Sequence, residues 1–185
     1  MREHAVTALI DATHPFASRM PFNAAAAAKT CNIPLLCLTR PAWMPQIGDD
    51  WLEVENHQAA INSLGTANKR IFLTVGRLEI DAYIAAPHHF YLVRTIDEVS
   101  PKLLPNAEYI TIRAPFNVAG EQALMKEHRI DTLITKNSGG AATVAKLFAA
   151  RNLGIKMILI SRLPKPDVPC VMSAEEALAW IIHRI

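Results

Sequence analysis

The sequence predicts an α/β fold in which parallel strands are covered by helices on both faces. Short apolar runs alternate along the chain with longer segments of helical pattern, and this order is typical of strands joined by helical crossovers. In the last units, the positions where a helix or strand should end are occupied by Gly154, Pro164 and Pro166. A chain of 185 residues, with 51% apolar and 19% charged residues, has a globular composition and holds one domain or two small ones.

The first elements form a strand, helix, strand unit. The apolar run 5–10 is expected to be a buried strand, because it stops at the polar turn 11–15. Segment 18–31 is rich in alanine, the residue with the highest helix propensity, and is expected to be a helix. The short apolar run 35–38 lies between two prolines and is expected to be the second strand.

The rest of the chain repeats this alternation after a proline-rich connection. Apolar or β-branched runs bounded by turn residues predict strands, whereas apolar residues that recur with helical spacing predict helices. The expected strands are 70–75, 90–96, 109–112, 132–135 and 156–160, and the expected helices are 59–64, 79–85, 120–128, 142–152 and 174–185.

Charge and cysteine content exclude several classes of protein. A formal net charge of +2 with scattered basic residues does not provide the basic face that nucleic acid requires. The apolar runs are far shorter than the roughly 20 residues of a membrane span, and the N-terminus lacks the apolar segment of a secretion signal. We therefore expect a cytoplasmic protein with no nucleic-acid or membrane partner. The three cysteines are widely spaced, which favours reduced core thiols over a disulfide or a zinc site.

The turn at 136–140, Lys-Asn-Ser-Gly-Gly, is suited to an anion. A glycine pair between a strand and a helix lets the backbone approach a ligand closely, and the start of the helix favours negative charge. Lys136 would add a mobile positive charge, while Asn137 and Ser138 would supply neutral donors and acceptors. The alternative is that the two glycines form only a tight turn, with Ser138 capping the helix and Lys136 solvated. The segment alone does not decide between these interpretations.

Polar and basic residues are unusually frequent just after the expected strands, where ligands bind in parallel α/β folds. These residues are Asp11, Thr13, His14, Thr39, Arg40, Gly76, Arg77, Arg94, Asp97, Arg113, Lys136, Ser161 and Arg162. The arginines would offer paired donors to carboxylates or phosphates. We expect about half of them to be structural instead, paired with acidic neighbours such as Asp97 or Glu79 or with helix C-termini.

The turn after the first strand brings an acid, a hydroxyl and an imidazole together. His14 would donate a proton near neutral pH, because the reference pKa of histidine is about 6.5, and Asp11 would hold its tautomer. The alternative is that Asp11 and Thr13 satisfy backbone groups of the turn and His14 packs in the loop. Phe16 would stack on a flat ligand, although such aromatic residues are more often core residues. Neither a metal site nor a serine hydrolase is expected, since metal-ligand spacing and a Gly-x-Ser-x-Gly motif are missing.

Several ordered motifs resemble the precorrin-6A reductase family, known as CobK and CbiJ. The first two are Asp-Ala-Thr-His-Pro-Phe-Ala at 11–17 and Leu-Thr-Arg-Pro-Ala-Trp at 38–43. The later ones, in the same order as in the family, are Phe-Leu-Thr-Val-Gly-Arg at 72–77, Arg-Thr-Ile-Asp at 94–97, Arg-Ala-Pro-Phe at 113–116 and Thr-Lys-Asn-Ser-Gly-Gly at 135–140. The resemblance runs from about residue 6 to residue 166 and so covers nearly the whole chain.

The resemblance implies an NADPH-dependent reductase of cobalamin biosynthesis. Such an enzyme transfers hydride to one carbon–carbon double bond of precorrin-6A or cobalt-precorrin-6A, a tetrapyrrole with many carboxylates. It also implies two Rossmann-like lobes, which we expect at 1–97 and 98–185. The residues implied for NADPH are Gly76, Arg77, Lys136, Asn137, Ser138 and Gly139, and those implied for the tetrapyrrole are Thr13, His14, Phe16, Arg40 and Arg113. His14 would be the catalytic residue that protonates the ring, although the conjugated ring can also take a proton from water.

One departure from the family concerns the start of the chain. Members usually carry a strand and a Gly-Gly-Thr turn several dozen residues before the motif at 11–17, whereas this sequence has ten residues there. We therefore expect an N-terminally truncated first lobe, with weak NADPH binding and little turnover in this form. Two other interpretations stay open: a tetrapyrrole- or anion-binding module without catalysis, and a different α/β enzyme with a phosphate ligand. Arg40 follows the second strand, where a carboxylate would recognise an unphosphorylated ribose, and this detail favours NADPH.

Overall fold

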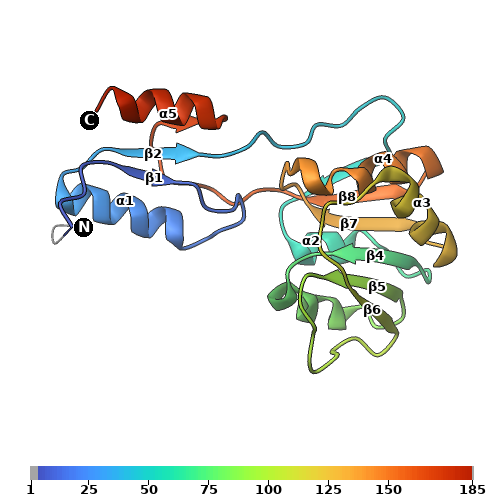
Figure 1. Cartoon of the computed structure of the whole chain (residues 1–185). Coiled ribbons are helices and arrows are strands. Elements are labelled where there is room, and N and C mark those ends of the chain that lie inside the picture. Colours follow the sequence, from blue (N-terminus) through green and yellow to red (C-terminus); the bar gives the residue numbers. More distant parts are fainter. Residues whose placement is uncertain (1–3, 185) are drawn as a thin grey trace. The chain divides into compact units, whose positions relative to one another are not determined.

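The computed structural model describes residues 4–184, which form two compact units (Figure 1). The larger unit is Met44–Ser161. The smaller unit combines the chain up to Trp43 with the chain from Arg162 onward. Every paired strand in both units is parallel to its neighbour, so the predicted α/β fold of parallel sheets and helices is confirmed.

The larger unit is built on a six-stranded sheet in the order β3-β8-β7-β4-β5-β6. Its strands are β3 (Trp51–Val54), β4 (Arg70–Thr74), β5 (Phe90–Thr95), β6 (Ala107–Thr111), β7 (Thr132–Lys136) and β8 (Lys156–Ile160). The central strands are near-continuous apolar runs because both faces of the sheet are covered. Phe72, Leu92, Leu133 and Ile158 are accordingly fully buried.

Helices cover the two faces of this sheet in pairs. They are α2 (His57–Asn62), the 3-10 helix η1 (Arg77–Ala85), α3 (Val118–Glu127), the short 3-10 helix η2 (Ala141–Thr143) and α4 (Ala145–Leu153). Helix α2 packs against η1, and α3 packs against α4. Right-handed crossovers place the two pairs on opposite faces, because the chain moves one way across the sheet through α2 and η1 and the other way through α3 and α4.

The smaller unit has a three-stranded sheet in the order β1-β2-β9. Its strands are β1 (Leu9–Asp11), β2 (Leu35–Leu38) and β9 (Cys170–Val171), and its helices are α1 (Met20–Cys31) and α5 (Ala174–Ile182). Helix α1 ends where Asn32 adopts a left-handed conformation with φ 54°. Helix α5 begins at a capping box, in which Ser173 and Glu176 satisfy each other's backbone N–H groups. No helix within residues 4–184 is long and apolar enough to cross a membrane.

The expected boundary between residues 97 and 98 does not match the division that the structure shows. Strands β5 and β6 lie on either side of that point and are paired neighbours, with Val93 opposite Tyr109 and Thr95 opposite Thr111. A boundary there would cut through one sheet. The chain instead leaves the smaller unit after Trp43 and returns to it at Arg162, so each expected lobe contributes to both units.

Two strands and the nature of one helix were not predicted. Strand β3 follows the proline-rich connection that was expected to be irregular, and β9 has only two residues. Both strands pair with longer apolar strands, β8 and β2, and this pairing is not visible in the local sequence. The segment expected to be a helix at 79–85 is a 3-10 helix that starts at Arg77.

Two of the three thiols are partners across strands. Cys37 on β2 lies opposite Cys170 on β9, although the positions are far apart in sequence. Cys37 is buried, whereas Cys170 is exposed, which corrects the expectation of core thiols for Cys170. Burial raises the pKa of the Cys37 thiol to about 12, and a hydrogen bond between the two thiols adds to this effect.

We expect iodoacetamide to alkylate Cys170 at least ~100-fold faster than Cys37 in the folded protein at pH 8. Only the thiolate is nucleophilic, and each pKa unit above the ambient pH removes about tenfold of it. Mass spectrometry of peptides from timed reactions measures both rates. In guanidinium chloride the two rates should converge. Equal rates in the folded protein would contradict the burial of Cys37.

Candidate functional site

The larger sheet has a topological switch point between β4 and β7. From β4 the chain moves outward through β5 to β6, and it then returns to β7 on the other side of β4. The loops that follow β4 and β7 therefore leave toward opposite faces, and the resulting crevice at the carboxyl ends of the strands is the usual ligand position in such sheets. The loop after β4 contains Gly76 and Arg77, and the loop after β7 begins at Lys136. The structure thus brings together two segments that the sequence predicted to bind one ligand.

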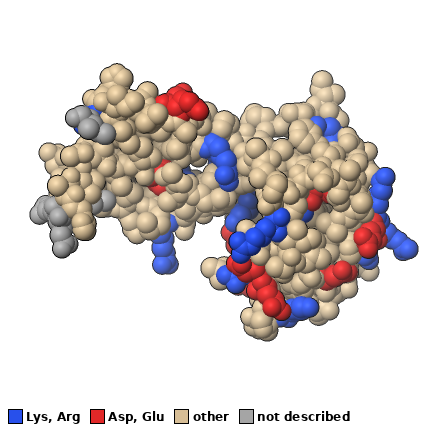
Figure 2. All heavy atoms as spheres, viewed as in Figure 1, with Lys and Arg blue, Asp and Glu red and all other residues tan. Residues whose placement is uncertain are grey.

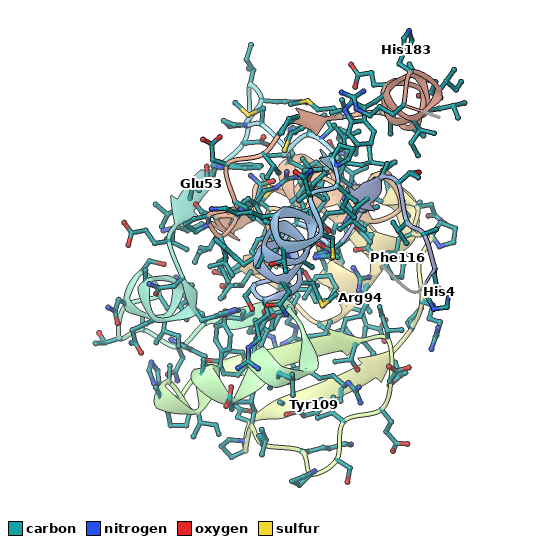
Figure 3. The ribbon with its side chains drawn as sticks, turned by 90° about the vertical axis from the view of Figure 1, so that its left-hand side faces the viewer. His4, Glu53, Arg94, Tyr109, Phe116 and His183 are labelled. Atoms are coloured by element: carbon teal, nitrogen blue, oxygen red, sulfur yellow. The ribbon has the colours of Figure 1, made fainter. Side chains whose placement is uncertain are left out.

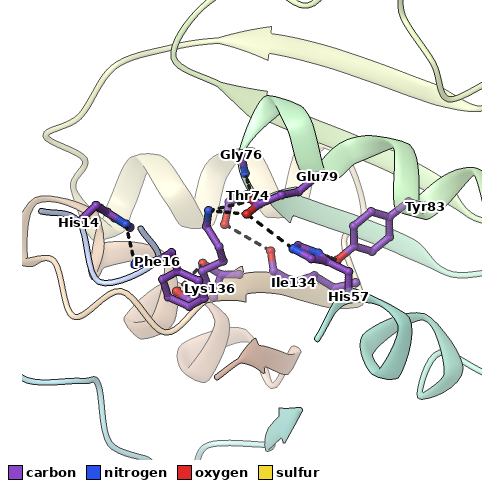
Figure 4. A network of polar contacts seen from close by, with 10 residues as sticks. His14, Phe16, His57, Thr74, Gly76, Glu79, Tyr83, Ile134 and Lys136 are labelled. Carbon is purple, nitrogen blue, oxygen red and sulfur yellow. Dashed lines mark hydrogen bonds and ion pairs between the residues drawn. The ribbon is translucent and has the colours of Figure 1, made fainter. Parts of the chain in front are cut away.

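A carboxylate joins these two loops (Figure 4). The ammonium of Lys136 donates to both oxygens of Glu79, at 2.8 and 3.0 Å. The backbone N–H of Gly76 donates to Oε2 of the same residue at 2.6 Å. Glu79 lies in the first turn of η1 and reaches back to the start of that helix. Lys136 is therefore held in an ion pair instead of being solvated.

The contacts of Glu79 continue into the interior of the unit. Nε2 of His57, the first residue of α2, lies 3.8 Å from Oε1 of Glu79. Nδ1 of the same ring is 3.1 Å from the hydroxyl of Tyr83, whose side chain is fully buried. Figure 4 shows these side chains in a row behind Lys136. Polar contacts thus run from Glu79 through His57 to the buried hydroxyl of Tyr83.

Glu79 is ionised over the whole physiological pH range. Burial alone would raise the pKa of its carboxyl group. The nearby His57 imidazole, the hydrogen bonds and charge of Lys136 and the Gly76 N–H outweigh that effect and lower the pKa to about 2. The pair Lys136–Glu79 therefore carries no net charge at neutral pH.

The rest of the 136–140 turn is held by its own backbone. The N–H of the buried Asn137 donates to the carbonyl of Ile160 at 2.9 Å, and the N–H of Ser138 donates to the carbonyl of Lys136 at 2.8 Å. Gly139 has φ 69°, a conformation that a residue with a side chain rarely adopts. The helix that follows, η2, has Gly140 as its N-cap residue.

Two predicted ligand-binding arginines share one acid at the ends of β4, β5 and β6. Asp97 accepts a hydrogen bond from Arg113 at 2.8 Å and lies 3.9 Å from Arg77. All three side chains are more than half exposed, so solvent screens these pairs and a ligand anion can replace Asp97 at little cost. On the face shown in Figure 2, basic and acidic side chains are mixed instead of forming one basic surface.

Arg94, also expected at a strand end, is a structural residue. Its guanidinium group donates to both carboxylate oxygens of Glu121 on α3, and both side chains are buried. The same group lies 3.8 Å from the centre of the Phe116 ring and 4.7 Å from that of Phe72. Arg94 is buried and Phe116 is half-buried; both are labelled in Figure 3. Arg94 is thus closed off from any ligand at the edge of the sheet.

A pocket of about 220 Å³ lies at the ends of β1 and β2 in the smaller unit. Its lining includes Thr13, His14 and Arg40, three of the residues implied for the tetrapyrrole. A complete cofactor or drug-sized ligand needs roughly 300–1,000 Å³. The pocket is therefore large enough for part of a ligand, such as one carboxylate side chain with its ring.

Hydrogen bonds in the first turn settle the tautomer of His14. The N–H of Phe16 donates to Nδ1 of His14 at 3.2 Å, so the proton of the neutral ring is on Nε2. Asp11 accepts the N–H of Thr13 at 3.0 Å, so it satisfies a backbone group of the turn, as one of the two interpretations of this turn predicts. The ring of Phe16 lies beside His14, with 6.1 Å between the centroids.

Two basic residues outside the pocket lining bond to backbone carbonyls of the same unit. Arg162 donates to the carbonyl of Arg40 at 2.8 Å, and Lys165 donates to the carbonyl of Ala17 at 2.6 Å. Burial, and secondarily the charge of Arg40, lowers the pKa of Arg162. Because the charge of Arg40 acts on Arg162, an anion near these two guanidinium groups would be favoured.

The predicted residues thus form one group in each unit. Gly76, Arg77, Arg113, Lys136, Asn137, Ser138 and Gly139 lie at the carboxyl edge of the larger sheet, and Thr13, His14, Phe16 and Arg40 lie at that of the smaller sheet. Sequence reasoning missed Glu79 and His57 as parts of the site. The position of Glu79, three residues after Gly76, is the sequence signal of a capping carboxylate, whereas nothing in the sequence singles out His57. Within the described residues, no three His, Cys, Asp or Glu side chains are grouped to hold a metal ion.

Parallel sheets, a topological switch point and cations at the strand ends are typical of α/β proteins whose ligands are anionic. Comparison with known families specifies this class. The family described as "Precorrin-6x reductase CbiJ/CobK" matches residues 1–182, and the chain belongs to that family. The resemblance inferred from the sequence motifs is therefore confirmed.

Individual relatives agree with this assignment. The precorrin-6A reductase of Sinorhizobium sp is 45% identical over 179 residues, which are 96% of this chain and 69% of that protein. The one from Rhodococcus erythropolis is 44% identical, over 98% of this chain and 73% of that protein. A solved structure, "CobK precorrin-6A reductase", matches with a TM-score of 0.94 at 38% identity and covers 99% of this chain and 73% of its own. Relatives named cobalt-precorrin-6A reductase are 27–30% identical.

Proposed function

We propose that the chain is a precorrin-6A reductase of cobalamin biosynthesis that uses NADPH. The family match over residues 1–182 carries this proposal. In the reaction, hydride from the nicotinamide forms a bond to one carbon of a ring double bond, a proton adds to the other carbon, and NADP⁺ is released. The relatives named for the metal-free substrate are more similar than those named for the cobalt form, which supports precorrin-6A as the substrate.

The cations at the strand ends support a substrate with many carboxylates. Arg40 with its neighbour Arg162 in the smaller unit, and Arg113 with Arg77 in the larger unit, offer paired N–H donors that match carboxylate geometry. Thr13 and Phe16 would complete the substrate contacts beside His14 with a hydroxyl and a flat ring.

The switch-point crevice supports a cofactor site. Gly76, Arg77 and the turn from Lys136 to Gly139 lie where dinucleotides bind in open α/β sheets. When bound, the nicotinamide supplies the hydride, so the residues of the chain orient the two rings and handle charge and proton.

His14 is the proton donor in this proposal. Its neutral tautomer carries the proton on Nε2, because Nδ1 accepts the N–H of Phe16. Protonation to the imidazolium would put a second proton on Nδ1 and displace the Phe16 N–H, and from that form Nε2–H would give its proton to the ring carbon next to the one that receives hydride. General acid catalysis of this kind contributes typically about 10²–10⁴-fold to the rate.

Anaerobic incubation of the purified chain with NADPH and precorrin-6A tests the proposal. We expect NADPH oxidation equal in amount to a tetrapyrrole product that has gained two hydrogens, at the low rate expected of this N-terminally short form, and a still slower reaction with cobalt-precorrin-6A. His14→Gln should lower the rate by about 10²-fold or more, whereas His183→Gln, on an exposed histidine that follows α5, should not. Tetrapyrrole binding without any NADPH oxidation would contradict the proposal and favour a non-catalytic binding module.

A further inference from the structure

The Lys136–Glu79 pair is tightly built for two residues that are 57 positions apart. Both carboxylate oxygens accept from the ammonium, and the side chains are 18% and 28% exposed. A lysine side chain carries about 2 kcal/mol of rotamer entropy, so without a partner its ammonium would sample many positions at the crevice. Glu79 confines the ammonium to one of them.

Glu79 is itself fixed from two other directions. The Gly76 N–H donates to Oε2, and His57, which rests on Tyr83, lies against Oε1. These contacts come from the β4–η1 loop and from the start of α2, which belong to different parts of the fold. The Glu79 carboxylate is therefore held in one position, and it in turn fixes the flexible side chain of Lys136.

Gly76 makes room for this arrangement. Its φ of −72° suits any residue, so backbone conformation does not explain the glycine. A Cβ atom at this position would lie 2.8 Å from Oε2 of Glu79 and 3.5 Å from Nζ of Lys136. The first distance is shorter than real Cβ contacts, so alanine at position 76 would push the carboxylate away from the lysine. Space for the ion pair accounts for the glycine.

We propose that Glu79 is the positioning residue for Lys136: it holds the ammonium at the β4–β7 crevice, ready for an anionic group of the ligand. This role rests on the proposed function, in which Lys136 meets a cofactor phosphate or, as the second source of the same chemistry, a substrate carboxylate. Glu79 does not touch the ligand and acts through the lysine. His57 and the backbone N–H of Gly76 hold the Glu79 carboxylate in place.

A double-mutant cycle with Glu79→Gln and Lys136→Gln tests this role in the full chain. The dissociation constant of NADPH and the KM values for NADPH and precorrin-6A are measured for each variant. Lys136→Gln removes a charge-assisted contact and should weaken its ligand by about 10–100-fold. Glu79→Gln should weaken the same ligand by at least about fivefold, and it should have no further effect when Lys136 is already replaced. The KM that changes identifies the source: that of NADPH for a phosphate, that of precorrin-6A for a carboxylate.

Two further variants separate positioning from stability. Gly76→Ala displaces the carboxylate without removing a charge and should reproduce the change in KM seen with Glu79→Gln. Asn117→Ala removes the cap of α3 in the same unit and should lower the melting temperature without changing either KM.

The proposal is overturned if Glu79→Gln weakens binding by the same factor with and without Lys136, because the residue would then act on the loop in general. It is also overturned if Lys136→Gln leaves both KM values unchanged while the unsubstituted chain turns over. Absence of turnover in the unsubstituted chain would instead contradict the proposed function.

Discussion

Replacing Glu121 by alanine should lower the free energy of unfolding by about 3–5 kcal/mol, the largest stability effect that we expect in this chain. The substitution leaves the guanidinium group of Arg94 buried between Phe72 and Phe116 without its carboxylate. Removing one partner of a buried ion pair costs far more than the pair contributes, because the remaining charge stays desolvated. Urea denaturation at pH 7.5 measures the loss.

A second buried basic group lies in the same unit. Lys146 on α4 is 5% exposed. Burial, followed by the charge of Arg94, lowers its pKa to about 7, and Glu121 opposes this decrease. Without Glu121, the pKa of Lys146 would fall further, because the carboxylate that raises it is gone.

Two variants test whether burial is the cause. Asp97→Ala also takes a carboxylate from an arginine, but the pair is more than half exposed and should cost no more than about 1 kcal/mol. The apolar pair Arg94→Met with Glu121→Leu should recover most of the stability lost in the single variant. If Glu121→Ala costs no more than Asp97→Ala, the buried pair does not have the role described here.

Local sequence patterns predicted most elements of the fold but not their order in the sheet. Alternating apolar runs and helical segments identify strands such as β4, β5, β7 and β8, since each run buries both faces. The order β3-β8-β7-β4-β5-β6 depends on which strands pair, and pairing involves residues far apart in the chain. The return of the C-terminal segment to the smaller unit is non-local in the same way, which is why the expected boundary after residue 97 was wrong.

In the candidate site, too, the sequence predicted single residues but not the contacts that they make with residues far away in the chain. Lys136 was predicted because of its position after a strand, but its pairing with Glu79 requires β7 to lie next to β4. Arg77 and Arg94 have equivalent positions in the sequence pattern. Helix α3 buries Arg94 through Glu121, whereas Arg77 stays exposed beside Asp97. Only the packing of a helix from a later part of the chain separates the structural arginine from one that can meet a ligand.

NADPH titrated into the purified chain, with NADH as the control cofactor, tests the reductase assignment most directly. Nicotinamide fluorescence is followed with and without precorrin-6A, because a shared site couples the two ligands. We expect saturable NADPH binding that is at least about tenfold tighter than NADH binding, a difference of about 1.4 kcal/mol, and that shifts when the tetrapyrrole is added. An unchanged fluorescence signal across the titration, with and without precorrin-6A, would contradict the assignment of this chain as an NADPH-dependent reductase.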